Sequence, residues 1–297
     1  MMVLELNQLH KEYGRIIAVN QLSLGIVPGS VFGLLGPNGS GKTTTLGMIL
    51  GVTQPTSGAF SWFGAAPTHA QRKRIGAILE KPNFYPTFSA YKNLQLVCKI
   101  KGVPESRIES VLELVGLQER MHDFFKTYSL GMKQRLAIGS ALLADPEVLI
   151  LDEPTNGLDP AGIADIRQLI LEIADTGKTI ILASHLLDEV QKVCSEFAIL
   201  KQGNLIHTGK VEESFGDQVV LEIGATDLGS LAEQISTFPG YHSHLRQKDS
   251  LRVQCTTDTE AAAVNAFLVE QGIYVSHLTT LRQTLEQQFM EILSKHA

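Results

Sequence analysis

Residues 36–43 constrain the fold of this chain more than any other part of the sequence. They read GPNGSGKT and fit the pattern G-x-x-x-x-G-K-[ST]. The apolar run VFGLL at 31–35 precedes them directly, and a helical pattern over 44–50 follows. This order predicts a buried strand, a glycine-rich loop and a helix, the setting in which the pattern binds phosphate. The residues expected to surround the phosphates are Gly36, Pro37, Asn38, Gly39, Ser40, Gly41, Lys42, Thr43 and Thr44.

Each residue type in this loop has a physical role in holding a polyphosphate. Glycines allow backbone N–H groups to turn inward around phosphate oxygens, and the helix that follows points its positive end at the same place. Lys42 supplies a positive charge for the outer phosphates, and the Thr43 hydroxyl can ligate Mg²⁺. We therefore expect ATP and Mg²⁺ as cofactors. The alternative is a glycine-rich turn with a chance lysine, which the strand, loop and helix order disfavours.

Short apolar runs alternate with helical patterns through the first 210 residues. The runs at 148–151, 179–183 and 197–200 are rich in Val, Ile and Leu. Such runs are typical of strands in a parallel sheet that is buried on both faces. The N-terminal runs at 3–6 and 22–24 alternate apolar and polar residues instead, which predicts a small antiparallel layer. The expected fold class is α/β, with a P-loop NTPase core in a domain spanning 1–212.

Two regions depart from this α/β pattern. Residues from about 85 to 145 contain three helical segments without a convincing strand, which predicts a helical subdomain inserted into the core. Residues 217–297 are expected to form a small α+β accessory domain of βαβ type. Its expected elements are strands at 219–223, 251–255 and 273–275, helices at 228–235 and 260–271, and a closing helix with apolar residues from 281 to 293.

Two acidic residues, Asp152 and Glu153, follow the apolar run at 148–151. Ligands of parallel sheets bind at the carboxyl ends of the strands, so these carboxylates are expected to face the phosphate loop. Asp152 would hold Mg²⁺ through water, and Glu153 would act as general base on the attacking water. The alternative is a solvated strand end, which the phosphate loop in the same chain disfavours.

The order of these motifs resembles the ATP-binding subunit of an ATP-binding-cassette (ABC) transporter, over roughly residues 3–210. The segment YSLGMKQR at 128–135 matches the family signature LSGGQ-x-QR. Ser129 and Gly131 occupy the positions of the signature serine and second glycine, whereas Leu130 replaces a glycine and Met132 a glutamine. This variant is similar to the ATPases of bacitracin- and lantibiotic-type exporters. The resemblance implies that the segment contacts the γ-phosphate of ATP held by a partner subunit.

The resemblance implies roles for four further residues. Asp159 lies in a segment, NGLD at 156–159, that resembles the loop crossing the dimer interface, so it would also act on the partner's ATP. His185 resembles the switch histidine that senses the γ-phosphate, and would be catalytic together with Glu153 and Lys42. Tyr13 resembles the aromatic residue that stacks on adenine. Glu80 stands where the family normally has a glutamine, and would be a Mg²⁺ ligand.

Charge and hydropathy limit the partners of the chain. It has 25 Lys and Arg against 31 Asp and Glu, a formal charge of −6, which disfavours nucleic acid. No segment offers the roughly 20 apolar residues of a membrane span, so membrane contact is expected only through a separate permease subunit. Three scattered cysteines indicate a reducing compartment. We expect a cytoplasmic protein, peripheral on the membrane through its permease.

The signature lies too far from its own phosphate loop to complete that site. The resemblance therefore implies a homodimer, or a pair with a related ATPase, that powers an exporter by ATP hydrolysis. Two alternatives stay open: a nucleotide-gated switch without useful turnover, and a non-transport ATPase acting on ribosomes or DNA. Glu153 argues against the switch, since a site without turnover needs no base. The non-transport ATPase lacks support, because the segment between Lys42 and Tyr128 contains no insertion with the heptad repeats of a coiled coil.

Overall fold

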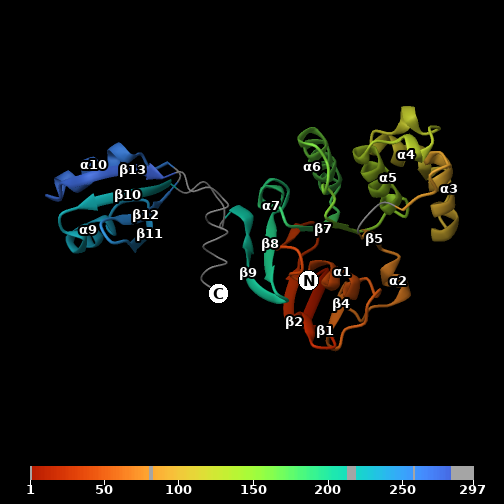
Figure 1. Cartoon of the computed structure of the whole chain (residues 1–297), viewed down its shortest axis with the longest axis horizontal. Coiled ribbons are helices and arrows are strands. Elements are labelled where there is room, and N and C mark those ends of the chain that lie inside the picture. Colours follow the sequence, from red (N-terminus) through yellow and green to blue (C-terminus); the bar gives the residue numbers. More distant parts are fainter. Residues whose placement is uncertain (1, 80–82, 213–218, 257, 282–297) are drawn as a thin grey trace. The chain divides into compact units, whose positions relative to one another are not determined.

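The computed structural model describes residues 2–79, 83–212, 219–256 and 258–281. The chain divides into two compact units between Val211 and Glu212. The first unit contains β1 to β9 and α1 to α7, and the second contains β10 to β13 with α9 and α10 (Figure 1). No helix in the described ranges is long and apolar enough to cross a membrane.

A six-stranded sheet forms the centre of the first unit. Its strands follow the order β5-β6-β7-β3-β8-β9, and all neighbouring pairs are parallel except β8 and β9. Every residue of β3, β6 and β7 is buried, which explains why these strands are almost continuous runs of apolar residues. The strands predicted from those runs are confirmed. The bounds are β3 (Val31–Leu35), β5 (Ile75–Ile78), β6 (Val148–Asp152), β7 (Thr179–Ser184), β8 (Glu196–Lys201) and β9 (Asn204–Lys210).

A second sheet, antiparallel and three-stranded, lies against this one with a helix between them. Its order is β2 (Ile16–Ile26), β1 (Leu4–Tyr13) and β4 (Ser57–Trp62), and α1 (Lys42–Ile49) shares one apolar core with both sheets. Trp62 is fully buried there, and its indole N–H donates to the carbonyl of Ile49 at 2.9 Å. The antiparallel layer was predicted, although without β4. This core fixes the start of α1, and hence the phosphate loop, against the central sheet.

Three helices form the group predicted for the inserted region. They are α3 (Ala90–Lys101), α4 (Arg107–Leu114) and α5 (Leu130–Leu142), which pack on one another, and α5 also contacts β5 and α6 (Figure 1). Helix α4 ends at Leu114, because Gly116 takes a φ of +67° and turns the chain. The remaining helices are α2 (His69–Arg72), α6 (Pro160–Asp175) and α7 (Leu187–Val193), with short 3₁₀ turns at Gln118–Arg120 and Phe125–Thr127.

The second unit is a four-stranded sheet with the element order β-α-β-β-α-β. Its strands follow the order β11-β12-β10-β13, and every neighbouring pair is antiparallel. This is the split βαβ arrangement, in which the two strands joined by a helix are separated by a third strand. The bounds are β10 (Val219–Ala225), α9 (Leu228–Ile235), β11 (Tyr241–Arg246), β12 (Leu251–Cys255), α10 (Ala261–Glu270) and β13 (Val275–Leu281).

Three sequence-based expectations for the second unit are corrected or lie outside the description. Strand β11 was missed, since its residues YHSHLR are mostly exposed and give no apolar alternation. The strand expected at 273–275 begins at Val275 and runs to Leu281. The closing helix expected up to residue 293 falls outside the described residues beyond Leu281.

Candidate active site

The register of three neighbouring strands brings the predicted catalytic segments to one edge of the central sheet. On one side of β7, Ala183 pairs with Asp152 of β6. On its other side, Ser184 pairs with Leu35 of β3. The residues that follow these strand ends, Gly36, Glu153 and His185, therefore leave the sheet at the same level. This is the carboxyl edge, where parallel sheets bind their ligands.

Two glycines of the phosphate loop are required by close backbone contacts. A Cβ atom on Gly36 would lie 2.3 Å from the carbonyl oxygen of Leu200. Gly41 has a φ of +105°, and a Cβ there would lie 2.4 Å from the carbonyl oxygen of Ala18. No side chain fits at either position, so the loop can follow this path only with glycine. The path leads directly into the first turn of α1.

Several hydrogen-bond donors of the loop have no partner among the described residues. They are the backbone N–H groups of Gly39, Gly41, Lys42 and Thr43, and the buried hydroxyl of Ser40. Helix N-termini leave such N–H groups unpaired, and a buried unpaired hydroxyl is costly. A phosphate group would satisfy these donors together, so the residues present fit a polyphosphate ligand.

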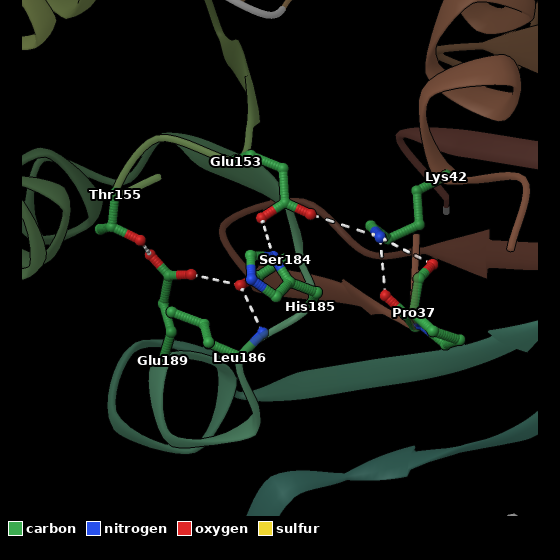
Figure 2. Close-up of polar contacts among 9 residues, drawn as sticks. Pro37, Lys42, Glu153, Thr155, Ser184, His185, Leu186 and Glu189 are labelled. Carbon is green, nitrogen blue, oxygen red and sulfur yellow. Dashed lines mark hydrogen bonds and ion pairs between the residues drawn. The ribbon is translucent and has the colours of Figure 1, made fainter. Parts of the chain in front are cut away.

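The ammonium group of Lys42 lies inside the site rather than in solvent. Its side chain is only 5% exposed. Nζ donates to the carbonyl oxygens of Gly36 at 2.6 Å and Pro37 at 3.3 Å, and lies 3.3 Å from Oε1 of Glu153 (Figure 2). Partly desolvated charges interact strongly, so Lys42 supplies a concentrated positive charge at the loop.

Glu153 connects Lys42 to His185. Its second carboxylate oxygen, Oε2, lies 2.6 Å from Nδ1 of His185, while Oε1 faces Lys42 (Figure 2). Its backbone has a φ of +50°, which is unusual for a residue other than glycine and is often found at functional sites. The backbone N–H of Glu153 donates to the carbonyl of Ala183 at 2.9 Å, which holds this conformation. The three residues predicted to be catalytic thus form one contiguous cluster.

The predicted magnesium ligands lie on two elements of the same edge. Asp152 is buried at the last position of β6, and Thr43 is exposed in the first turn of α1. Carboxylate and hydroxyl oxygens are donors that suit Mg²⁺, which usually takes few protein ligands and completes its shell with water and phosphate. The described residues contain no group of three or more His, Cys, Asp or Glu that could hold a metal. Glu80 lies outside the described residues.

Tyr13 is an exposed ring at the end of β1. It is 51% exposed and pairs across the hairpin with Ile16 of β2. The Lys11 ammonium lies 4.9 Å from the ring centroid. An exposed ring of this kind can stack on a nucleobase.

Ser129, Gly131 and Asp159 line a separate cavity of about 450 Å³. Ser129 caps α5 by accepting a hydrogen bond from the Met132 N–H at 3.2 Å, and Asp159 caps α6 in the same way at the Gly162 N–H, at 3.0 Å. Among the described residues that line this cavity, none comes from the phosphate loop. The structure therefore brings these three residues together, apart from the cluster of Lys42, Glu153 and His185.

Comparison with known proteins identifies the family. The family model described as ABC transporter matches residues 19–156. An uncharacterized ABC transporter ATP-binding protein of Bacillus subtilis, YhcH, is 40% identical over 98% of this chain and 95% of its own length. The chain belongs to the ABC transporter ATP-binding proteins. This ABC ATPase is also 34% identical to the bacitracin transport ATP-binding protein BcrA of Enterococcus faecalis, over 98% of this chain and 96% of that protein.

Solved structures agree with this assignment. CbiO1 of Clostridium perfringens, part of the ABC transporter complex CbiONQ, superposes with a TM-score of 0.67 and 30% identity over 73% of this chain and 91% of that one. The P-loop NTPase core is therefore that of an ABC cassette. Members of this family hydrolyse ATP, and ATP is the nucleotide of the present ABC ATPase.

Sequence reasoning missed one polar residue of this ABC ATPase, Glu189 of α7. Its side chain is fully buried and accepts hydrogen bonds from Thr155 and Ser184. Burial raises the pKa of the Glu189 carboxyl, and these two hydrogen bonds, together with the charge of Arg167, oppose the rise. An acidic residue two positions after Leu187 reads as solvated in the sequence, and only the packing of α7 reveals its burial.

A second detail of the ABC ATPase concerns the approach to the signature. Tyr128, directly before Ser129, is buried, and its hydroxyl donates to the carbonyl of Arg120 at 2.7 Å. Burial raises the pKa of Tyr128 to about 12, so this hydroxyl keeps its proton at neutral pH and remains a donor. The bond ties the start of α5 to the 3₁₀ turn at Gln118–Arg120.

Proposed function

We propose that this chain is the ATP-hydrolysing subunit of a membrane exporter, acting as a dimer on a separate permease. The observation that carries the proposal is the cluster at the sheet edge, where Glu153 lies between Lys42 and His185. The similarity to a bacitracin transport ATP-binding protein supports an exporter. The variant signature around Leu130 and Met132 supports the same class.

The geometry suits direct hydrolysis of the γ-phosphate of ATP. The Glu153 carboxylate takes a proton from water as the water oxygen attacks the γ-phosphorus. The bond from that phosphorus to the bridging oxygen breaks, and ADP leaves with the electron pair. Lys42 places its charge beside the outer phosphates, and its N–H neighbours in the loop bind the same oxygens. His185 donates from Nδ1 to Glu153, which orients the carboxylate and leaves Nε2 for the substrate.

A magnesium ion would be held by Thr43 and Asp152, with Glu80 as a further ligand. When bound, it would neutralise charge on the β- and γ-phosphates. The adenine base would stack on Tyr13. The phosphates would be surrounded by Gly36, Pro37, Asn38, Gly39, Ser40, Gly41, Lys42, Thr43 and Thr44, several of whose donors have no partner among the described residues.

The position of the signature cavity supports a head-to-tail dimer. Ser129, Gly131 and Asp159 line a cavity with no described phosphate-loop residue of their own chain. In a two-fold dimer each cavity would cover the ATP of the partner, so that both sites become complete together. Cassettes of this family typically dimerise and work with a separate permease.

We place the subunit in the cytoplasm, attached to the membrane through its permease. All three cysteines, Cys98, Cys194 and Cys255, are buried and unpaired, which fits a reducing compartment. The formal charge of −6 gives no support for nucleic acid as a partner.

Replacement of Glu153 by Gln tests the proposed function. The amide cannot accept the proton of water, so phosphate release should fall by about two orders of magnitude or more, while ATP binding persists and ATP-bound dimers accumulate. Phosphate release, equilibrium ATP binding and light scattering measure these three effects. The matched control is Glu172→Gln on α6, whose exposed carboxylate accepts a hydrogen bond from Gln168 of the same helix.

Two outcomes would contradict the proposal. Unchanged turnover in Glu153→Gln would remove Glu153 from its role as base. Binding of ATP by the wild-type chain without any phosphate release, with or without permease-containing membranes, would favour a nucleotide-gated switch instead.

A further inference from the structure

Glu189 lies between the two loops that carry the catalytic residues. Its Oε1 accepts a hydrogen bond from Thr155 Oγ1 at 2.9 Å, and its Oε2 accepts one from Ser184 Oγ (Figure 2). Thr155 is two residues after Glu153, and Ser184 is directly before His185. Thr155 and Ser184 are themselves buried. A single buried carboxylate therefore bridges the segments on which the base and the histidine sit.

The hydrogen-bond directions require two acceptors at Glu189. The Ser184 hydroxyl accepts the backbone N–H of Leu186 at 3.0 Å, so its own proton points to Glu189. Thr155 donates to the other oxygen. An ionised carboxylate satisfies both donors, whereas an amide of the same size offers only one oxygen. Burial raises the pKa of the Glu189 carboxyl, and the positive charge of Arg167, which binds Asp188, opposes that rise.

Besides the contact between Glu153 and His185 itself, two connections join these loops in the described part of the chain, and the Glu189 bridge is the second. The first is at the backbone, where the Glu153 N–H donates to Ala183. With one connection at the strand end and another through the side chain of Glu189, the two loops are fixed at two points. With a single connection the two segments could rotate relative to each other, whereas two connections fix their relative orientation. The contact between Glu153 and His185 is therefore held at a defined geometry.

We propose that Glu189 is a positioning residue of the ATPase, whose carboxylate holds Glu153 and His185 in the arrangement needed for hydrolysis by bridging Thr155 and Ser184. The inference rests on the proposed function, since it assigns Glu189 a part in the turnover of that site. In the described part of the chain the Glu189 carboxylate hydrogen-bonds to Thr155 and Ser184, and neither belongs to the phosphate loop. It acts through the loops it joins, and the Thr155 loop continues to Asp159 at the signature cavity.

The test is Glu189→Gln in the full chain, compared with wild type and with Glu172→Gln. The variant keeps the side-chain size but leaves Thr155 or Ser184 without an acceptor. We expect kcat to fall by about 10- to 100-fold, since small misplacements of reacting groups have effects of this size. The ATP dissociation constant should change by less than about threefold, because the phosphate loop is untouched. A purely structural role would lower kcat, ATP affinity and thermal midpoint together.

Two further variants keep the proposal testable if Glu189→Gln folds poorly. Ser184→Ala and Thr155→Val each remove one donor and leave the carboxylate in place. Each should lower kcat with little change in ATP affinity, and adding either to Glu189→Gln should lower it by less than the product of the single effects. Wild-type kcat in all three variants would overturn the positioning role, as would full additivity. Failure of the proposed function would give a different result from failure of the positioning role, because the wild-type chain itself would then release no phosphate.

Discussion

At the scale of single residues, the phosphate loop gives a matched pair of substitutions. Gly36→Ala would place a Cβ 2.3 Å from the backbone oxygen of Leu200 in β8, the strand that pairs with β3. Gly47→Ala, in the middle of α1, would place one at an ordinary 3.5 Å from Thr53. The first should lower the free energy of unfolding by about 1–3 kcal/mol and weaken ATP binding. Gly47→Ala should leave the free energy of unfolding unchanged or raise it by about 0.5–1 kcal/mol, because alanine favours a helix more than glycine does.

Urea unfolding followed by the fluorescence of Trp62 measures both effects. Trp62 is the single tryptophan of the chain and is fully buried in the core that α1 shares with both sheets. Equal midpoints for the two variants would show that the loop relaxes around a Cβ at Gly36, contrary to the close contact described above.

The individual residues of the site were predictable to different degrees. Lys42 and Glu153 each belong to a segment that follows an apolar strand, so strand ends were enough to predict that Glu153 faces the phosphate loop, whereas the role of His185 came from the resemblance to the family. Glu189 was not predictable in this way, because nothing in the sequence distinguishes a buried acidic residue on a short helix from a solvated one. Its burial depends on packing against Ser184, five residues earlier, and against Thr155, which is 34 residues away in the sequence.

At the scale of elements, the start of α5 has two roles that substitution can separate. Ser129 caps the helix, and we propose that its hydroxyl also acts on the partner's ATP. Ser129→Ala removes both the cap and the hydroxyl, and should lower the free energy of unfolding by about 1 kcal/mol. Ser129→Gly also removes the hydroxyl, but glycine is an acceptable cap residue, so it should lower stability by only a few tenths of a kcal/mol. Turnover should fall to a similar extent in both variants, because both lack the hydroxyl. If turnover followed stability, with Ser129→Gly close to wild type, the hydroxyl would act only as a cap.

Elements differ in how well the sequence predicts them. Strands β3, β6 and β7 are short and apolar because both faces of the central sheet are covered, and they were predicted nearly to their ends. Strand β11 is exposed at the edge of the second sheet and carries the polar residues YHSHLR, so hydrophobic patterning gives no signal for it. Alternation within a strand does not encode which strands become its neighbours, so the strand order of that sheet could not be predicted from it.

At the scale of the whole molecule, two chains complete each active site in the proposed dimer. The signature cavity is lined by no described residue of the phosphate loop of the same chain, so the proposal assigns each ATP to residues of both subunits. An active site shared in this way can be inactivated either at its phosphate loop or at its signature. Lys42→Ala removes the buried charge of the phosphate loop. Gly131→Asp places a negative charge beside the partner's γ-phosphate, at a position with room for a side chain because its nearest contact is 3.9 Å away, at Leu158.

The most direct measurement is therefore phosphate release by a mixture of these two inactive variants. In a mixed dimer one site carries both defects, while the other combines the intact phosphate loop of the Gly131→Asp chain with the intact signature of the Lys42→Ala chain. The account predicts that each variant alone is inactive and that an equal mixture recovers up to about a quarter of the wild-type rate per chain, because half of the dimers are mixed and each has one complete site. No activity at any mixing ratio, with mixed dimers verified by differential tagging, would contradict the shared site.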